Sequence, residues 1–296
     1  MKLKHLVPRK LREKWRLNRL RKEILAYYKR IEKTTDEEKI ALNFLKGLNV
    51  FTISSIKLIF PYKFINKYRK QPVKINYDGK LLLYYVEHCG KKLYFPREMK
   101  LEKIQDYYRG ICLEQDSSSP HCYLNTNFQV KEGDVCLDIG CAEGNFALEI
   151  VEKAGKVYLF EADLKWIEAL EATFAPWREK VTIINKFVSD NDSNNVMKLD
   201  TFFGSGQSID LIKTDAEGAE MEILEGGKEL LTRSNTKIAI TTYHRPDAES
   251  AVTDFLNKIG YKVVPTKGFM IFIYDSKCSD LYLRRGLIHA LKESVN

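Results

Sequence analysis

Residues 135–146 read VCLDIGCAEGNF, and this stretch decides the fold. A short apolar run leads into a glycine-containing turn, and helix-forming residues follow the turn. Gly140 and Gly144 let the backbone approach a ligand closely, where a Cβ atom would collide with it. The N-terminus of the helix that follows Gly144 can accept a carboxylate. The stretch predicts the first strand, turn and helix of an α/β domain that binds a ligand at this turn.

The spacing of the two glycines distinguishes between kinds of ligand. They stand four residues apart, with an acid two residues before the first, whereas GxGxxG is typical of a dinucleotide pyrophosphate site. The pattern therefore favours the methionine part of S-adenosylmethionine, and a plain strand-to-helix turn is the structural alternative. The residues predicted to contact this cofactor are Asp138, Gly140, Cys141, Ala142 and Gly144.

Short apolar strands alternate with helical segments from Asp134 onward. The predicted strands are 135–139, 156–160, 181–187, 209–214 and 237–242, and the predicted helices are 145–153, 164–174, 219–231 and 248–258. This alternation implies a parallel sheet covered by helices on both faces. Two further predicted strands, 261–264 and 268–274, are joined by a tight connection and indicate an antiparallel pair.

Acidic residues stand where two of these strands end. Glu161 closes the second strand 17 residues after Gly144, where a carboxylate can accept hydrogen bonds from both ribose hydroxyls, and Ala162 follows it. Asp215 and Glu217 follow the fourth strand, and ligands of parallel sheets bind beyond the carboxyl ends of the strands. We predict that these four residues bind the cofactor. For Glu217, a complement to the dipole of the next helix is the structural alternative.

Three residues are candidates for a catalytic base. His244 follows the fifth strand and can act as a general base near neutral pH; its alternative is a hydrogen-bonded structural role. Asp215 is the second candidate. His121 is the third, in a segment that can cover the cofactor.

These motifs, in this order, resemble the FkbM family of methyltransferases over about residues 120–274. Residues 212–220, IKTDAEGAE, are similar to the family's IKxDxEGxE, and residues 138–144 are similar to its DxGAxxG, with Cys141 replacing the usual alanine by another small residue. Residues 199–202, LDTF, look like its short LD segment, and Val188-Ser189-Asp190 looks like its adenine-side segment.

The resemblance implies an α/β fold: a Rossmann-like class I methyltransferase sheet of seven strands, the last antiparallel. It implies S-adenosylmethionine as methyl donor, with Ser189 and Asp190 on the adenine side, and usually in-line O-methylation of a sugar, polysaccharide or natural-product hydroxyl. The next strand end carries Tyr243 and His244 instead of an acidic pair, so we expect no metal. The alternatives are a nicotinamide-dependent Rossmann oxidoreductase and a non-catalytic module that binds S-adenosylmethionine.

The sequence predicts four regions. Residues 1–35 form a basic amphipathic helix, residues 36–119 a helical and β-hairpin extension, residues 120–276 the methyltransferase domain, and residues 277–296 a helical tail. The hairpin is predicted from the Asp78-Gly79 turn between apolar runs 73–77 and 81–86, with a third strand at 92–95.

The net charge of +8 belongs to the first region. Residues 1–33 hold 13 basic and 3 acidic residues, whereas the rest of the chain is slightly acidic. An apolar seam at 17, 20, 24, 27 and 31 predicts a helix packed on its own domain or on a twin chain, and peripheral contact with a membrane is the alternative. Few aromatics interleave with the basic residues, so nucleic acid is not favoured as a partner.

Cysteine usage and hydropathy indicate the compartment. The six cysteines form no CxxC pair, which predicts a reduced chain without disulfides or a zinc site. No signal peptide is apparent, and lysines interrupt the most apolar early stretch, 40–65, so no membrane-spanning segment is predicted. We expect a cytoplasmic protein, with the inner membrane face as the alternative location for residues 1–33.

Overall fold

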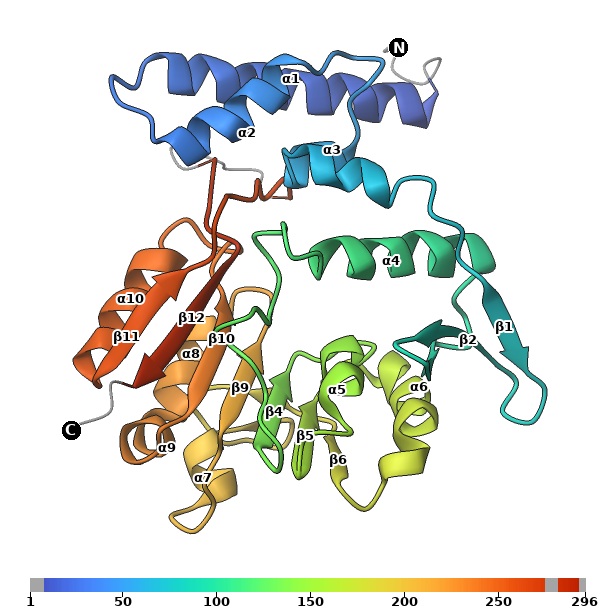
Figure 1. The fold of residues 1–296 in the computed structure, drawn as a ribbon, viewed down its shortest axis with the longest axis vertical. Helices are drawn as coiled ribbons and strands as arrows, with labels where there is room; N and C mark the ends of the chain where they lie inside the picture. The colour runs from blue at the N-terminus through green and yellow to red at the C-terminus, as the bar shows by residue number, and fades with distance from the viewer. Residues whose placement is uncertain (1–7, 275–281, 293–296) are drawn as a thin grey trace.

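A seven-stranded mixed sheet forms the centre of the computed structural model, which describes residues 8–274 and 282–292 (Figure 1). The strand order is β11-β12-β10-β9-β4-β5-β6. The strands are β4 (Val135–Ile139), β5 (Lys156–Phe160), β6 (Val181–Ile184), β9 (Leu211–Thr214), β10 (Lys237–Thr241), β11 (Tyr261–Pro265) and β12 (Leu287–Lys292). Neighbouring strands are parallel except at β12, which runs antiparallel to both β10 and β11. The predicted Rossmann-like sheet with its last strand antiparallel is confirmed.

Alternate side chains of each strand enter two different cores, as the two-residue period of a strand requires. Cys136 packs on the face covered by α5 (Asn145–Ile150) and α6 (Leu164–Phe174). Leu137 packs on the opposite face. The helices on that face are α7 (Leu199–Phe203), α8 (Glu220–Gly226), α9 (Lys228–Arg233) and α10 (Ala248–Lys258). The sheet is therefore covered on both sides, which leaves the ends of its strands to carry the loops that can bind a ligand.

The residues before the sheet form an extension that packs into the core of the sheet domain and covers its upper end. It consists of α1 (Arg9–Lys29), α2 (Asp36–Lys46), α3 (Ser55–Ile59), the 3-10 helix η2 (Lys63–Lys67), β1 (Ile75–Asp78), β2 (Leu83–His88), β3 (Lys91–Tyr94) and α4 (Leu101–Glu114). The three strands form the predicted hairpin and its third strand. Val86 and Leu93 enter the same core as α5, and α4 runs across the upper end of the sheet (Figure 1).

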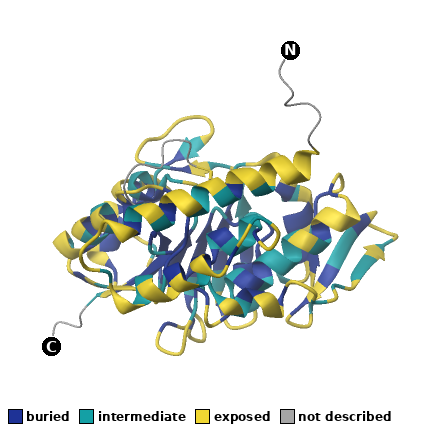
Figure 2. Cartoon of the chain, turned by 90° about the horizontal axis from the view of Figure 1, so that it is seen from above, coloured by how far each residue is buried: buried dark blue, intermediate teal, exposed yellow. Residues whose placement is uncertain are grey.

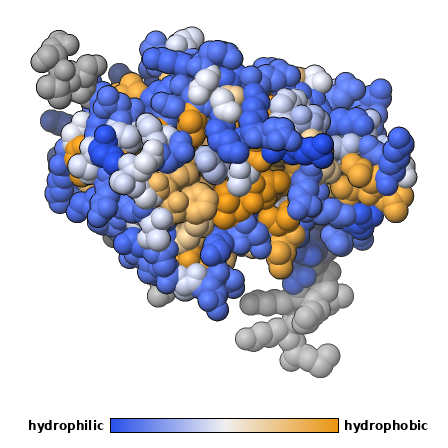
Figure 3. Space-filling view, turned by 90° about the horizontal axis from the view of Figure 1, so that it is seen from below, coloured by the Kyte–Doolittle hydropathy of each residue, from blue (hydrophilic) through white to orange (hydrophobic). Residues whose placement is uncertain are grey.

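Helix α1 buries most of its predicted apolar seam inside this chain, but Ile31 lies beyond the helix and is exposed. Leu17, Ile24 and Tyr28 pack against α2 and against Phe269, Ile271, Ile273 and Leu283. Seen from above, the outer face of the helix is exposed (Figure 2). Seen from below, the molecule is largely hydrophilic, with hydrophobic residues gathered in a central patch and in a smaller group to its right (Figure 3). Among the described residues, no helix is both long and apolar enough to cross a membrane.

The end of the chain differs from its prediction. Residues 268–274 form no strand; their apolar side chains pack on α1 and α2 instead, and Met270 makes only an isolated bridge to Arg284. The strand that pairs with β11 is β12, so the predicted domain end at 276 is wrong, and the predicted helical tail is wrong for the strand residues 287–292; residues 277–281 and 293–296 of that prediction lie outside the described residues. Leu287, Ile288 and Ala290 are fully buried. A strand buried on both faces gives a continuous apolar run that periodicity cannot distinguish from a helix.

Two other predicted elements are divided. The predicted helix 219–231 consists of α8 and α9, which meet at Gly227. The predicted strand 181–187 ends at Ile184, and the following residues belong to a separate pair, β7 (Phe187–Val188) with β8 (Val196–Met197). The five cysteines in the described residues are free.

Two glycines allow a test of this packing. A Cβ atom on Gly226 would lie 1.9 Å from the carbonyl oxygen of Ser189, whereas one on Gly110, inside α4, would meet nothing within 4 Å. Gly226→Ala should lower the free energy of unfolding by about 1–3 kcal/mol through overpacking. Gly110→Ala should raise it by about 0.4–1 kcal/mol, because alanine restricts the unfolded chain. Urea unfolding of the two variants measures both changes, and equal effects would contradict the packing described.

Candidate active site

Two cavities meet at the carboxyl ends of the central strands. The first, of about 300 Å³, is lined by the ends of β4, β5 and β9 and by the segment around β7. The second, also about 300 Å³, lies between the turn after β4, the end of β9 and helix α4. Gly140, Ala142, Asp215 and Glu217 line both cavities. The structure therefore brings the residues predicted from three separate motifs to one edge of the sheet.

The turn after β4 is packed tightly against the neighbouring strands. Gly140 has a φ of +65°, and a Cβ atom there would lie 2.2 Å from the carbonyl oxygen of Asp215. Gly144 has a φ of +80°, and a Cβ atom there would lie 2.8 Å from the ring of Phe174. Glycine is thus required by the backbone conformation and by contacts within the chain. The structure adds this packing reason to the ligand approach predicted from the sequence.

Glu161 lies at the end of β5 and lines the first cavity with Ala162. Its Oε2 accepts a hydrogen bond of 2.8 Å from the backbone N–H of Ala142, and its Oε1 accepts one of 2.7 Å from that of Asp163. These bonds fix the carboxylate against the β4 turn. Because each carboxylate oxygen has two lone pairs, capacity remains to accept hydrogen bonds from a ligand in the cavity.

Asp138 lines neither cavity. It is buried beneath the turn, 2.8 Å from the Nζ of Lys213, which also donates to the carbonyl oxygen of Gly140 at 2.9 Å. Burial alone would lower the pKa of Lys213, but the carboxylates of Asp138 and Asp215 raise it, so this ammonium stays charged. Asp138 acts on the site through Lys213, which lines the second cavity and was not predicted as a site residue.

Asp215 lies where the two cavities join, and several side chains hold it. Tyr123 donates a hydrogen bond of 2.8 Å to Oδ2, His121 Nε2 lies 3.2 Å from the same oxygen, and His244 Nε2 lies 3.7 Å from Oδ1. Burial alone would raise the pKa of Asp215, but the two histidines and Lys213 hold it well below its usual range. The carboxylate is therefore ionised at neutral pH.

The two predicted histidine bases contact Asp215 but line neither cavity. The Nδ1 of His244 lies 2.9 Å from Glu220 Oε1, and 3% of its side chain is exposed. Burial alone would lower the pKa of His244, but Glu220, Asp215 and Glu217 raise it. In this arrangement both histidines are placed to orient Asp215.

Asp215, Glu220 and His244 each offer a ligand atom within 4.8 Å of the other two, so they are the residues at this site that could converge on a metal ion. Glu220 Oε1 already accepts hydrogen bonds from the backbone N–H of Ala216 and Gly218 and from Thr241 Oγ1, besides its contact with His244. A cation would have to replace these bonds. That no metal is needed stays a prediction.

The second cavity contains acids that the sequence did not point to. Glu143 is buried and accepts a hydrogen bond of 2.7 Å from Tyr107, and burial raises its pKa to about 7. Glu114, at the end of α4, lines the cavity and has no hydrogen bond or ion pair with any described residue; burial raises its pKa. Glu143 stood unassigned inside the first motif, whereas nothing in the local sequence marks Glu114.

That Ser189 and Asp190 contact the adenine stays a prediction. Ser189 and Asp190 line neither cavity, and Ser189 bonds through its backbone N–H to the carbonyl of Met197. The residues that line the first cavity there are Lys186, Phe187 and Val188. Glu217 lines both cavities with its side chain 89% exposed, and Cys141 lines the second.

The pKa of His244 gives a stability test. Its folded-state pKa is raised above 6.5, so the stability it contributes is present at lower pH and is lost as the pH rises through the folded value. The difference in unfolding free energy between wild type and His244→Gln should therefore shrink as the pH rises above about 6.5. Denaturant unfolding at a series of pH values measures it.

His289 is the matched control with the opposite sign. Burial lowers its pKa, so its contribution is present above pH 6.5 and is lost as the pH falls. The difference between wild type and His289→Gln should therefore grow with pH. Parallel pH profiles for the two variants would contradict the described environment of His244.

Comparison with known proteins identifies the family of this chain. A family model described as the Methyltransferase FkbM domain matches residues 107–263. A probable ribosomal RNA small subunit methyltransferase A from Methanococcoides burtonii is 30% identical over 163 residues, which are 50% of this chain and 60% of that relative. The chain thus spans less than two thirds of the curated relative's length.

Solved structures of methyltransferases are similar at low identity. One is the methyltransferase FkbM from Methylobacillus flagellatus KT, at 15% identity and a TM-score of 0.45, with 64% of this chain and 52% of that chain covered. Another is the magnesium protoporphyrin IX methyltransferase from Synechocystis PCC 6803 with bound SAM, at 12% identity and a TM-score of 0.40, with 66% and 86% covered.

The family match decides between the enzyme classes that the sequence left open. It covers the strands and turns that form both cavities, and it includes α4 from Tyr107 onward. The nicotinamide-dependent oxidoreductase alternative is wrong, because the matching domain is a methyltransferase domain. Matched over more than half of its residues, the chain belongs to the FkbM family of methyltransferases.

Proposed function

We propose that this protein transfers a methyl group from S-adenosylmethionine to a hydroxyl of a sugar, polysaccharide or natural product. The observation that carries the proposal is the pair of cavities that share Gly140, Ala142, Asp215 and Glu217. One cavity has a carboxylate suited to a ribose, and the other is lined by carboxylates suited to an acceptor that donates hydrogen bonds. Two adjoining cavities of this kind fit a donor and an acceptor that meet at the shared wall.

The residues of the first cavity fit the donor. Glu161 would accept hydrogen bonds from the ribose hydroxyls, and Phe160, Val188 and Ile223 offer an apolar surface to the adenine. The turn at Gly140 and the N-terminus of α5 would hold the amino-acid tail. When bound, the donor supplies a methyl group already activated by its sulfonium.

The second cavity supports a hydroxyl acceptor. Glu114, Glu143 and Asp215 line it, and carboxyl oxygens accept hydrogen bonds from hydroxyl groups, so they suit a polyhydroxylated molecule. The same acids repel a phosphate backbone, which argues against RNA as the acceptor although the curated relative is named as a probable ribosomal RNA methyltransferase.

We propose Glu114 as the base and Asp215 as the group that orients the acceptor. Asp215 was a predicted base, but its lowered pKa makes it a weak proton acceptor. The predicted bases His121 and His244 would then be positioning residues that act through Asp215. Glu114 is open to the cavity, and its raised pKa makes it the stronger base of the two carboxylates.

In the proposed step, the acceptor oxygen bonds to the methyl carbon as the carbon–sulfur bond breaks. The hydroxyl proton passes to Glu114, and S-adenosylhomocysteine leaves. Alignment of the two reactants against the shared wall supplies much of the rate acceleration, because the electrophile needs no further activation.

The donor site is tested by Glu161→Ala. Loss of hydrogen bonds to a charged group should weaken S-adenosylmethionine binding by about 10- to 150-fold, as measured by calorimetry. Glu171→Ala, on the exposed face of α6, is the matched control and should bind as wild type does. Failure of the wild type to bind S-adenosylmethionine would overturn the proposed function.

The base is tested by Glu114→Gln. Turnover should fall by about 10²- to 10⁴-fold while donor affinity is unchanged. Glu102→Gln, exposed near the start of the same helix, should keep full activity. His244→Ala should retain more turnover than Glu114→Gln; the reverse order would return the role of base to His244.

The acceptor class is tested with a panel of sugars, glycans, hydroxylated natural products and a structured RNA. The readout is S-adenosylhomocysteine formed in the presence of EDTA and, separately, of magnesium. Turnover with a hydroxylated small molecule or glycan supports the proposal, and methylation of the RNA alone contradicts it. Activity that EDTA abolishes and magnesium restores would assign a metal to Asp215, Glu220 and His244.

A further inference from the structure

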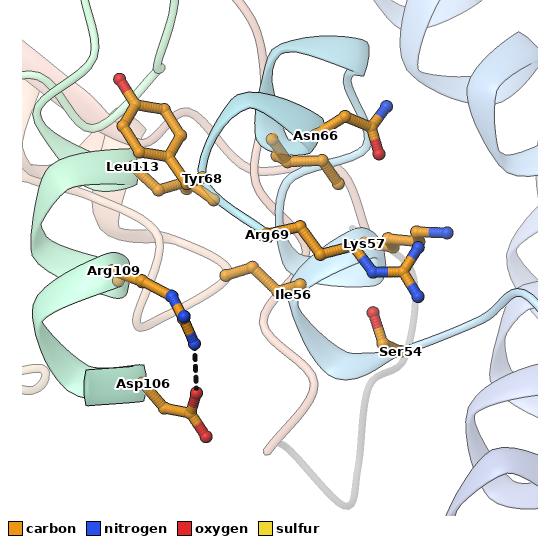
Figure 4. Close-up of a pocket in the computed structure, with 11 residues that line it drawn as sticks. Ser54, Ile56, Lys57, Asn66, Tyr68, Arg69, Asp106, Arg109 and Leu113 are labelled. Carbon is orange, nitrogen blue, oxygen red and sulfur yellow. Dashed lines mark hydrogen bonds and ion pairs between the residues drawn. The ribbon is translucent and has the colours of Figure 1, made fainter. Parts of the chain in front are cut away.

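A third cavity, of about 290 Å³, lies on the other side of α4 (Figure 4). Helix α3, η2 and α4 enclose it. Its wall differs in composition from that of the second cavity. Apolar side chains form much of it, and three basic residues line it, Lys57, Arg69 and Arg109. Gly110 lines both this cavity and the second one, so α4 forms a partition between them.

The apolar part of the cavity is formed by residues that are fixed in the core. Ile65 and Leu113 are each 3% exposed, and Ile56 packs beside them. They belong to one hydrophobic cluster that also holds Phe60 and Tyr68. A preformed apolar hollow near 300 Å³ is at the lower end of the size range for ligand sites, which suits a short hydrocarbon segment.

Among the described residues, no carboxylate forms an ion pair with the basic part of the cavity. Lys57 and Arg69 extend to the same side of the cavity (Figure 4). Burial lowers the pKa of Lys57, and the nearby charges of Arg69 and Lys14 lower it further. In the described parts of the chain, Lys57, Arg69 and Lys14 form no ion pair with a carboxylate. Lys57 and Lys14 donate only to the backbone carbonyls of Thr52 and Phe51, at 2.8 and 2.9 Å.

The opposite side of the cavity is neutralised. Arg109 Nη1 lies 3.2 Å from Asp106 Oδ1, and its Nε donates to the carbonyl of Gln71 at 2.9 Å (Figure 4). Positive charge without a partner is thus confined to the side formed by Lys57 and Arg69. An anion there would relieve the repulsion between these cations.

We propose that this cavity binds a single-chain amphiphile with an anionic head, a carboxylate or a phosphate. The head would lie against Lys57 and Arg69, and the first carbons of the chain would pack on Ile56, Ile65 and Leu113. This binding site is separate from the two methyl-transfer cavities. Its occupancy does not depend on the chemistry proposed for them, although its ligand would pack against the helix that carries Glu114.

Calorimetry on the full chain tests the proposal with four probes: dodecanoate, dodecyl phosphate, dodecanol and inorganic phosphate, the amphiphiles below their micelle concentrations. Dodecanoate and dodecyl phosphate should bind at least about tenfold more tightly than the other two, because only they satisfy both parts of the cavity. If dodecanol bound as tightly as dodecanoate, the cavity would be a hydrophobic site that does not recognise an anion. Binding of inorganic phosphate as tight as that of dodecyl phosphate would reduce it to an anion site, and either result overturns the proposal.

Single substitutions test whether the amphiphile binds in this cavity. Arg69→Gln should weaken dodecanoate binding at least about tenfold, and because Arg69 makes no hydrogen bond within the described residues the fold should be unaffected. Lys63→Gln, exposed in the same segment but outside the cavity, is the matched control. Ile56→Thr should weaken dodecanoate while leaving inorganic phosphate unchanged. Wild-type affinity in Arg69→Gln would place the ligand elsewhere and contradict the proposal.

Discussion

The buried ion pair between Asp138 and Lys213 is the interaction on which the site depends. The two residues face each other across the parallel strands β4 and β9, in direct register. Desolvating both charges is costly, and breaking such a pair by removing one partner typically costs about 3–5 kcal/mol. Lys213 makes two further contacts besides this ion pair. It donates to the carbonyl oxygen of Gly140, and its Nζ lies 5.0 Å from the ring centroid of Tyr123. One buried ammonium therefore contacts both the turn and the tyrosine that bonds to Asp215, and its charge helps to keep Asp215 ionised.

The extension before the sheet completes the active site. Motifs on the sheet supply the turn, Glu161 and Asp215, but the wall of the second cavity comes from α4, and His121 and Tyr123 come from the segment that links α4 to β4. Hairpin residues Val86 and Leu93 share a core with α5, and α1 packs on residues near 270. In the proposed reaction, the extension that holds α4 in place would therefore help to determine which acceptors reach the shared wall.

Much of the sheet could be predicted because its strands and helices have clear periods: the bounds 135–139, 156–160, 164–174 and 248–258 agree with the structure. The loop residues on strand ends, such as Glu161, followed from the topology of parallel sheets. β12 could not be predicted, because its burial on both faces removes the alternation that marks a strand. Glu114 and Lys213 could not be assigned either, since their roles arise from contacts between segments distant in sequence.

Helix α4 separates two opposite electrostatic environments. Glu114, Glu143 and Asp215 make one side acidic, and Lys57 and Arg69 make the other side basic. In the proposed reaction, the acidic side would suit both a cationic sulfonium donor and a neutral acceptor rich in hydroxyls, and it would keep anions away from the reacting atoms. The basic side would hold an anionic group on the other side of α4. Helix α4, with Gly110 at this point, holds the acidic and the basic cavity close together but keeps their charged groups apart. Each cavity can therefore select its own ligand.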